Sequence, residues 1–273
     1  MGGKFIMVIV KTWGIEETQK LSVELLEDLF KGNIGAIRIP NFISKEICEK
    51  ALNGIKEYGV NYYEGVYPKI GKIGTTQFEH RFSIEKKKEY FKKAVIANQA
   101  RESIFRDSGD LAKNVIRFVG DAWPHNVDFA IEEETGDTYF AGLVRVMDRA
   151  LIHVDWAGGL DGLFPEWTIG KINAQLAWNI YLQPSANGGS TVVYNRPWKK
   201  SDEAFYKLKD SYAYDYEAVK NAECIRITPQ QGELVFFNPQ NYHEVQKASG
   251  SEDRITVSSF AGLMPNKDIV FWS

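Results

Sequence analysis

The chain has 273 residues, of which 44% are hydrophobic, so it is long enough to bury one large core. Its net charge of -3 and isoelectric point of about 5.9 exclude a basic surface that would attract nucleic acid or an anionic membrane. No apolar run reaches membrane-spanning length, and the run at residues 5–10 is too short for a secretion signal. Cys48 and Cys224 both fall in apolar patterns, which predicts buried free thiols in a reducing compartment. We therefore expect a soluble cytoplasmic protein that binds neither nucleic acid nor a membrane.

The N-terminal part of the chain mixes short strands with helices. Apolar runs predict strands at residues 5–10 and 34–39. Helical spacing of apolar residues predicts helices at residues 22–30, at residues 44–58 with a serine as N-cap, and over residues 86–120. Lysines and glutamates alternate at the start of the last helix, which is typical of a solvated face.

From residue 137 onward the pattern changes to short β-rich segments separated by Gly, Pro, Asn and Asp. The expected strands span residues 139–147, 172–182, 191–194, 225–228, 234–237, 255–260 and 269–272. Several short strands with turn signals favour two packed sheets over alternating strands and helices. We expect a mainly β fold with flanking helices, of the double-stranded β-helix or cupin-like jelly-roll type. It would form a single domain over residues 1–273, with helical support over about 1–135 and the jelly-roll core over about 136–273.

Two histidines and one aspartate stand in the pattern of an iron site. His153 and Asp155 form a His-x-Asp pair, and His243 follows Asp155 by 88 residues. Two histidines and one carboxylate form the facial triad of non-haem Fe(II) oxygenases, which leaves coordination positions open for other ligands. Residues two apart on a strand point to the same side, so His153 and Asp155 can reach one ion. A turn at residues 238–239 and a loop after it would deliver His243. The pair alone is a weak motif, because a histidine hydrogen-bonded within the core is the alternative.

Arg254, Thr256 and Ser258 alternate along a predicted strand and therefore face one side. One charged and two hydroxyl side chains are unfavourable in a dry core, so they indicate a polar cavity. A planar guanidinium binds a carboxylate through two parallel hydrogen bonds, which suits a dicarboxylic cosubstrate. The alternative is an Arg254 at the surface. Between the ligand segments, Gly188 and Gly189 mark either an ordinary turn or a close approach of the backbone.

In the order His-x-Asp, Gly-Gly-x-Thr, distal His and then Arg, the chain resembles the 2-oxoglutarate/Fe(II)-dependent oxygenase superfamily. More narrowly, it resembles the carrier-protein-independent branch. That branch holds the welwitindolinone-type aliphatic halogenases and the hydroxylases of N-succinyl and free amino acids. The likeness is carried by residues 186–198, 232–243, 253–260 and 271–273, and more weakly by residues 36–42.

The resemblance implies Fe(II) bound by the two histidines and the aspartate, with 2-oxoglutarate as cosubstrate and O2 as oxidant. Arg254, with Thr256 or Ser258, would hold the far carboxylate of 2-oxoglutarate. Tyr181 and Thr191 would assist from neighbouring strands.

In the halogenases of this branch a small residue replaces the carboxylate ligand and opens a coordination site for chloride. Asp155 is present in this chain. The resemblance therefore implies hydroxylation rather than halogenation.

The sequence says less about the substrate. Trp156 directly follows a ligand and would border the pocket, in a glycine-rich segment (residues 156–167) with the composition of a lid. Trp123 would add a second indole wall, which fits a small, partly apolar molecule. Packing of both tryptophans in the core is the alternative. Arg145 and the acidic residues 132–134 would contact a charged substrate, although an acidic loop is more often solvated.

The leading hypothesis is a hydroxylase of an aliphatic C–H in a small soluble metabolite, an amino acid derivative or an alkaloid-like molecule, giving succinate and CO2. It would act without a carrier protein, as a monomer or homodimer. A second hypothesis keeps the site but changes the outcome to desaturation, cyclisation or epimerisation. A third is a non-catalytic jelly-roll protein that binds metal or acts as a sensor. Arg254 argues against the third, because a metal-binding module has no use for a dicarboxylate anchor.

Overall fold

The computed structural model describes residues 13–62, 64, 70–158 and 166–273. The strand expected at residues 5–10 lies outside these residues, as does much of the glycine-rich segment 156–167. Over the described part of the chain, no helix combines the length and the apolar character that a membrane span requires.

Most strands belong to one large sheet that is mainly antiparallel. Its order is β1 (Ile15–Glu17), β2 (Ala36–Ile39), β11 (Leu234–Phe237), β8 (Ala174–Gln183), β13 (Ile255–Leu263), β6 (Leu143–Val146), β4 (Gly71–Ile73) and β3 (Asn61–Tyr62). β14 (Ile269–Trp272) pairs with the second half of β13, and β5 (Val127–Phe129) pairs with β14. The N-terminal part, which we expected to be mainly helical support, thus also supplies strands to this sheet.

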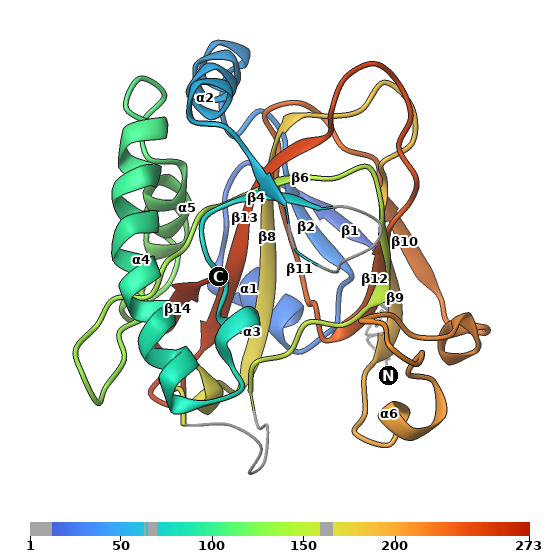
Figure 1. Cartoon of the computed structure of the whole chain (residues 1–273). Coiled ribbons are helices and arrows are strands. Elements are labelled where there is room, and N and C mark those ends of the chain that lie inside the picture. Colours follow the sequence, from blue (N-terminus) through green and yellow to red (C-terminus); the bar gives the residue numbers. More distant parts are fainter. Residues whose placement is uncertain (1–12, 63, 65–69, 159–165) are drawn as a thin grey trace, which may run out of the picture.

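A second sheet contains four antiparallel strands in the order β10 (Cys224–Ile227), β9 (Thr191–Pro197), β12 (Asn241–Val245) and β7 (Ala150–His153). It lies on the side of the molecule opposite the long helices (Figure 1). An apolar cluster joins the two sheets, and it includes Ala177, Tyr181, Val235 and Phe237 of the large sheet and Val193, Ile225 and Ile227 of the small one. Two sheets packed on each other confirm the predicted jelly roll.

Helices cover the outer face of the large sheet (Figure 1). They are α1 (Val23–Phe30), α2 (Lys45–Tyr58), α4 (Ile84–Ile104) and α5 (Leu111–Gly120). Ser22 and Ser44 cap the first two through their side chains, as their position before an apolar repeat predicts. The shorter elements are α3 (Gln77–His80), η1 (Thr168–Lys171), α6 (Asp202–Phe205) and η2 (Tyr216–Val219). The helices pack on alternate residues of the central strands, among them Trp178, Ile180, Leu234, Phe236 and Val257.

The structure corrects two predictions about this part. The helix expected over residues 86–120 is two helices, because Gly109 has a φ of 79° and Asp110 caps the start of α5. Cys48 is buried as expected, but Cys224 is exposed. It stands on the outward face of β10, which is an edge strand, and side chains alternate between faces along a strand.

Candidate metal centre

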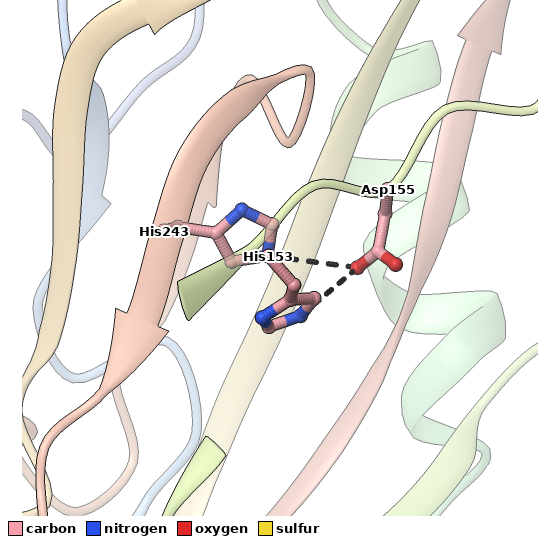
Figure 2. A group of neighbouring side chains, drawn as sticks. All are labelled: His153, Asp155 and His243. Atoms are coloured by element: carbon pink, nitrogen blue, oxygen red, sulfur yellow. Dashed lines mark ion pairs between the residues drawn. The ribbon is translucent and has the colours of Figure 1, made fainter. Parts of the chain in front are cut away.

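The predicted triad residues come together at the small sheet. His153 ends β7, Asp155 lies two residues beyond it, and His243 is at the middle of β12. Oδ2 of Asp155 is 3.6 Å from Nε2 of His153 and 3.5 Å from Nε2 of His243 (Figure 2). One ligand atom from each residue lies within 4.8 Å of the others, so the three can hold one metal ion.

Backbone carbonyl groups orient both imidazole rings. Nδ1 of His153 is 2.7 Å from the carbonyl oxygen of Leu151, and Nδ1 of His243 is 2.9 Å from that of Asn241. A ring nitrogen beside a carbonyl oxygen carries the proton and donates it, which leaves the Nε2 lone pair for a metal. Two imidazoles and one carboxylate, with no cysteine among them, are the donor set that suits Fe(II).

The charges at the triad also suit a metal. Burial alone would raise the pKa of Asp155, but the two neighbouring histidines bring it well below its usual value. Burial, with the charge of His153, lowers the pKa of His243 against the opposing effect of Asp155. Near pH 7 the carboxylate is therefore ionised and His243 is neutral, and these are the forms that bind a metal.

His243 lies in a strand, and not in the loop that we expected after residues 238–239. It pairs with His153 on β7 and with Val193 on β9. The backbone N–H of Asp155 donates to the carbonyl oxygen of Pro239 at 2.9 Å. Strand pairing thus aligns the two histidines, and the turn holds the third ligand beside them.

Arg254 is 3% exposed and lies just before β13. Its Nε donates to the carbonyl oxygen of Gly189 at 3.0 Å, and its guanidinium carbon lies 5.1 Å from the centroid of the Tyr181 ring. Gly189 has a φ of 71°, and a Cβ there would lie 3.1 Å from Cδ of the arginine. The Gly-Gly turn is therefore a close backbone approach to Arg254.

Among the described residues, no carboxylate forms an ion pair with Arg254. Burial lowers the pKa of its guanidinium from the usual value, while Tyr181 raises it. A guanidinium remains charged even so, since its ordinary pKa is far above neutrality. A buried charge without a counter-ion is costly, which indicates that an anionic ligand completes this part of the site.

Hydroxyl side chains follow Arg254 along β13 and lie on the neighbouring strands β8 and β9. The Thr256 hydroxyl is buried and has no hydrogen-bond partner within the described residues. Oγ of Ser258 lies 3.5 Å from the carbonyl oxygen of Leu143. The hydroxyls of Tyr181 and Thr191 are 3.2 Å apart and link β8 of the large sheet with β9 of the small sheet. A buried arginine beside an orphaned hydroxyl fits a carboxylate, such as the far end of 2-oxoglutarate.

The residues expected at the substrate lie in different surroundings. Trp156 is partly buried and packs against an aromatic cluster that contains Trp167 and Trp272. Trp123 belongs to the core under the helices, and its indole N–H donates to the carbonyl oxygen of Lys267 at 2.7 Å. Its one donor is satisfied there, which favours the packing alternative for Trp123. Arg145 is half-buried on β6.

Tyr212 is a neighbour of the triad that sequence reasoning missed. Its ring meets the edge of the His153 ring at a centroid distance of 5.6 Å, and its hydroxyl accepts from the backbone N–H of Leu151 at 2.9 Å. It comes from the connection between α6 and η2. That stretch carries no motif, so only the tertiary structure places it against a ligand.

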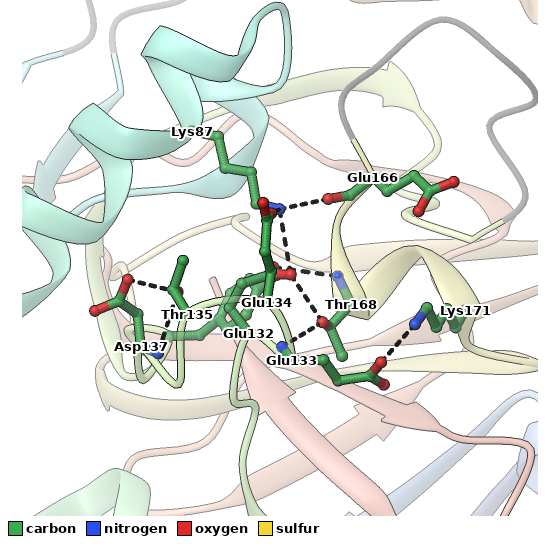
Figure 3. A network of polar contacts seen from close by, with 10 residues as sticks. Lys87, Glu132, Glu133, Glu134, Thr135, Asp137, Glu166, Thr168 and Lys171 are labelled. Atoms are coloured by element: carbon green, nitrogen blue, oxygen red, sulfur yellow. Dashed lines mark hydrogen bonds and ion pairs between the residues drawn. The ribbon is translucent and has the colours of Figure 1, made fainter.

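The charged clusters that we expected to be solvated are solvated only in part. Lys87 and Glu132 are 7% and 3% exposed, and Nζ lies 3.2 Å from Oε1 (Figure 3). Glu132 also accepts hydrogen bonds from the backbone and the hydroxyl of Thr168. Lys87 donates to the carbonyl oxygen of Glu166 at 2.5 Å. Through these contacts, Lys87 and Glu132 connect α4 with Glu166 and with Thr168 at the start of η1.

The fold and the triad together define a member of the 2-oxoglutarate/Fe(II) oxygenase superfamily. The structure is similar to that of an N-substituted L-amino acid dioxygenase from Burkholderia ambifaria AMMD, with a TM-score of 0.63, 18% sequence identity, and coverage of 93% of this chain and 92% of that chain. A second structure of that dioxygenase, in complex with alpha-KG, has a TM-score of 0.62. At this identity the likeness concerns the fold.

The chain belongs to the carrier-protein-independent halogenase WelO5 family, whose model matches residues 14–273. It is 37% identical over 237 residues to the leucinostatins biosynthesis cluster protein S of Purpureocillium lilacinum, covering 83% of this chain and 93% of the relative. It is 26% identical over 260 residues to the L-gamma-glutamyl-L-propargylglycine hydroxylase of Streptantibioticus cattleyicolor, covering 91% of each. The predicted resemblance is thus confirmed.

Proposed function

We propose that the protein is an Fe(II)- and 2-oxoglutarate-dependent hydroxylase of an aliphatic C–H in a small soluble metabolite, an amino acid derivative in the first place. The observation that carries this proposal is the presence of the triad beside a buried Arg254 that has no carboxylate partner among the described residues. A site that only held a metal would not need this second cation. The name of the related γ-glutamyl amino acid hydroxylase supports the same substrate class.

Separate groups of residues would bind the metal and the far end of the cosubstrate. His153, Asp155 and His243 would hold Fe(II) on one face and leave its other positions open. Arg254, with the Thr256 hydroxyl, would bind the far carboxylate of 2-oxoglutarate. The bound iron, with 2-oxoglutarate and O2, supplies the oxidation, in which one oxygen atom enters the substrate C–H bond, the other enters succinate, and CO2 leaves. The protein orients the target carbon and excludes water.

The presence of Asp155 favours hydroxylation over halogenation within this family. Its carboxylate lies within 3.6 Å of both histidine Nε2 atoms, and as a metal ligand it would take the position that a halide would need. Its negative charge would also repel a halide at that position. Desaturation, cyclisation and epimerisation use the same residues and are alternatives to hydroxylation.

The test is a product analysis. The protein is incubated with Fe(II), 2-oxoglutarate, O2 and chloride over a panel of N-acyl and γ-glutamyl amino acids, and succinate and product mass are measured. We expect one succinate per product and a gain of one oxygen atom. Loss of two hydrogens would assign desaturation, and a chlorine isotope pattern would assign halogenation. Absence of succinate over the whole panel would favour the non-catalytic hypothesis.

Substitution of the carboxylate ligand tests the role of Asp155. In Asp155→Gly with chloride present, we expect hydroxylation to fall by at least about 100-fold, because removing a ligand withdraws several kcal/mol of metal and charge stabilisation. A chlorinated product should appear in its place, detected by mass spectrometry. Hydroxylation at the wild-type rate in this variant would show that Asp155 is not a ligand.

A further inference from the structure

A row of polar side chains crosses the inner face of the large sheet. Lys72 on β4 pairs with Arg145 on β6, Arg145 pairs with Thr256 on β13, and Thr256 pairs with Tyr181 on β8. Directly paired residues of antiparallel strands project to the same side. The residues next to them, such as Val144 and Val257, point instead into the core under the helices. Arg145 therefore faces the same side as Thr256 and Tyr181, between the two sheets.

Arg145 differs from Lys72, the other cation of this row, because it has no ion-pair partner among the described residues. Lys72 forms an ion pair with Glu79. Across the described part of the chain, the Arg145 guanidinium has no ion pair, hydrogen bond or aromatic ring contact, although its side chain is half-buried. A guanidinium that gives up part of its hydration needs an acceptor in exchange.

The charge of Arg145 acts on Arg254. Burial lowers the pKa of Arg254, and the positive charge of Arg145 lowers it further. Arg145 thus lies within electrostatic reach of Arg254, the proposed cosubstrate anchor.

The balance of charge leaves Arg145 without a counter-ion even when the site is loaded. Two positive charges on Fe(II) and one on Arg254 cancel the two carboxylates of 2-oxoglutarate and the one of Asp155. Lys72 is neutralised by Glu79. Among the described residues, no carboxylate pairs with Arg145, and an anion on the substrate would supply one.

We infer that Arg145 is a second carboxylate anchor between the sheets, which binds the carboxylate of an amino-acid-type substrate and so directs its side chain toward the triad. The inference rests on the proposed function and narrows its substrate class to anions. A second candidate ligand of Arg145 is the carboxylate of 2-oxoglutarate that lies at the metal. The experiment distinguishes this carboxylate from that of the substrate.

The experiment compares Arg145→Gln and Arg145→Lys with the wild type and with Arg226→Gln, a control arginine exposed on β10. Far-ultraviolet circular dichroism and thermal melting confirm that each variant folds. The first arm titrates 2-oxoglutarate into the Fe(II)-loaded protein without oxygen, and follows the visible absorption of the chelated 2-oxo acid. We expect the Kd of 2-oxoglutarate in both Arg145 variants to stay within about threefold of the wild type. A 100-fold loss of affinity for 2-oxoglutarate would show that Arg145 binds the cosubstrate, and it would overturn the inference.

The second arm titrates γ-glutamyl and N-succinyl amino acids into protein loaded with Mn(II) and 2-oxoglutarate, each beside its C-terminal carboxamide. We expect the wild type and Arg226→Gln to bind at least one carboxylate about 100-fold more tightly than its carboxamide, and Arg145→Gln to lose that preference. Arg145→Lys should retain part of this preference, because lysine keeps the positive charge but lacks the planar guanidinium that makes two parallel hydrogen bonds. Equal binding of carboxylates and carboxamides, or no binding of any carboxylate, would overturn the inference. Failure of the proposed function would show separately, as a wild type that does not bind 2-oxoglutarate in the first arm.

Discussion

Each triad histidine donates one ring N–H to a backbone carbonyl two residues before it and presents the other nitrogen to Asp155. The carbonyls belong to Leu151 and Asn241, within the same strands as the ligands. Ring orientation is therefore a property of the local backbone. A side chain elsewhere need not rearrange for the metal to bind, so the site is preorganised.

Removal of one imidazole should abolish tight metal binding. In His243→Ala we expect the affinity for Fe(II) or Mn(II) to fall by at least about 100-fold, because one of three protein ligands is lost. Titration calorimetry with Mn(II) measures the loss. His125→Ala is the matched control, because this exposed histidine follows α5 and lies outside the triad. Tight binding that persists in His243→Ala would mean that the ligands are misassigned.

Arg254 should act on the far carboxylate of the cosubstrate and on nothing else. Arg254→Gln removes charge-assisted hydrogen bonds worth about 2–3 kcal/mol, so the Kd of 2-oxoglutarate should rise by roughly 100-fold. Pyruvate has the 2-oxo acid group without the far carboxylate, and its weaker binding should be the same in the variant and the wild type. The anaerobic absorption titration measures both ligands. A variant that loses both equally would show that Arg254 supports the fold of the site instead.

At the scale of elements, pairing between β7 and β12 determines which residues meet at the metal. His153 and His243 are register partners, and Val193 on β9 continues the same row. A slip of one residue would turn one histidine to the opposite face. The site therefore depends on the strand register as much as on the residues themselves.

The contact between α4 and the residues before η1 depends on the buried Lys87–Glu132 pair. In Glu132→Gln we expect unfolding free energy to fall by about 3 kcal/mol, because the ammonium of Lys87 loses its buried carboxylate partner and keeps only the exposed carboxylate of Glu134. Glu133→Gln is the control. Its ion pair with Lys171 is exposed, so its loss should change stability by less than about 1 kcal/mol. Urea unfolding followed by circular dichroism measures both, and equal effects would argue against the buried pair as the stabilising contact.

The same carboxylate should contribute to the dependence of stability on pH. Burial would raise the pKa of Glu132, but hydrogen bonds from Tyr139, Thr168 and Lys87 lower it overall from its usual value of 4.5. A carboxylate whose pKa is lowered by folding stabilises the protein above its unfolded pKa, and this stabilisation is lost as pH falls through the folded pKa. The loss of unfolding free energy caused by Glu132→Gln should therefore become smaller below about pH 4.5. A deficit that stays constant from pH 7 to pH 3 would contradict this account.

At the scale of the whole molecule, the candidate site lies between the two sheets. The small sheet and the turn next to it provide the triad, and the residue just before β13 of the large sheet provides Arg254. The hydrogen bond between Tyr181 and Thr191 crosses from one sheet to the other. A ligand held at both ends would therefore join the sheets.

Such a ligand should raise the melting temperature. At about 100 times its Kd, Mn(II) with 2-oxoglutarate should stabilise the fold by about 2.7 kcal/mol and raise the Tm by about 5–10 °C. Mn(II) with pyruvate at the same concentrations should give a smaller shift, because it does not reach Arg254. Differential scanning fluorimetry under nitrogen measures both. The same shift in His243→Ala would show that the effect does not come from the triad.

Much of the β-structure was predictable because its strands carry a strong local signal. β14 spans the predicted residues, and β8, β9, β10 and β13 differ from the prediction only at their ends. Ser44 and its apolar repeat likewise predicted α2. His243 was predicted in a loop, since Asn-Pro before it signals a turn and the five residues of β12 are too few to show an alternation. Lys87 and Glu132 looked solvated because a charge is buried only when its partner, here 45 residues away, folds against it.

The sequence by itself determined the class of fold and the residues of the triad, because apolar periodicity and a His-x-Asp pair are local patterns. It also predicted that Arg254, Thr256 and Ser258 share a face, because strands have a period of two. Only the tertiary structure decided that His243 sits opposite His153, that the Tyr212 ring contacts His153, and that Arg145 shares a row with Thr256. These are contacts between segments far apart in the chain, and they depend on strand register and burial, which no single segment encodes.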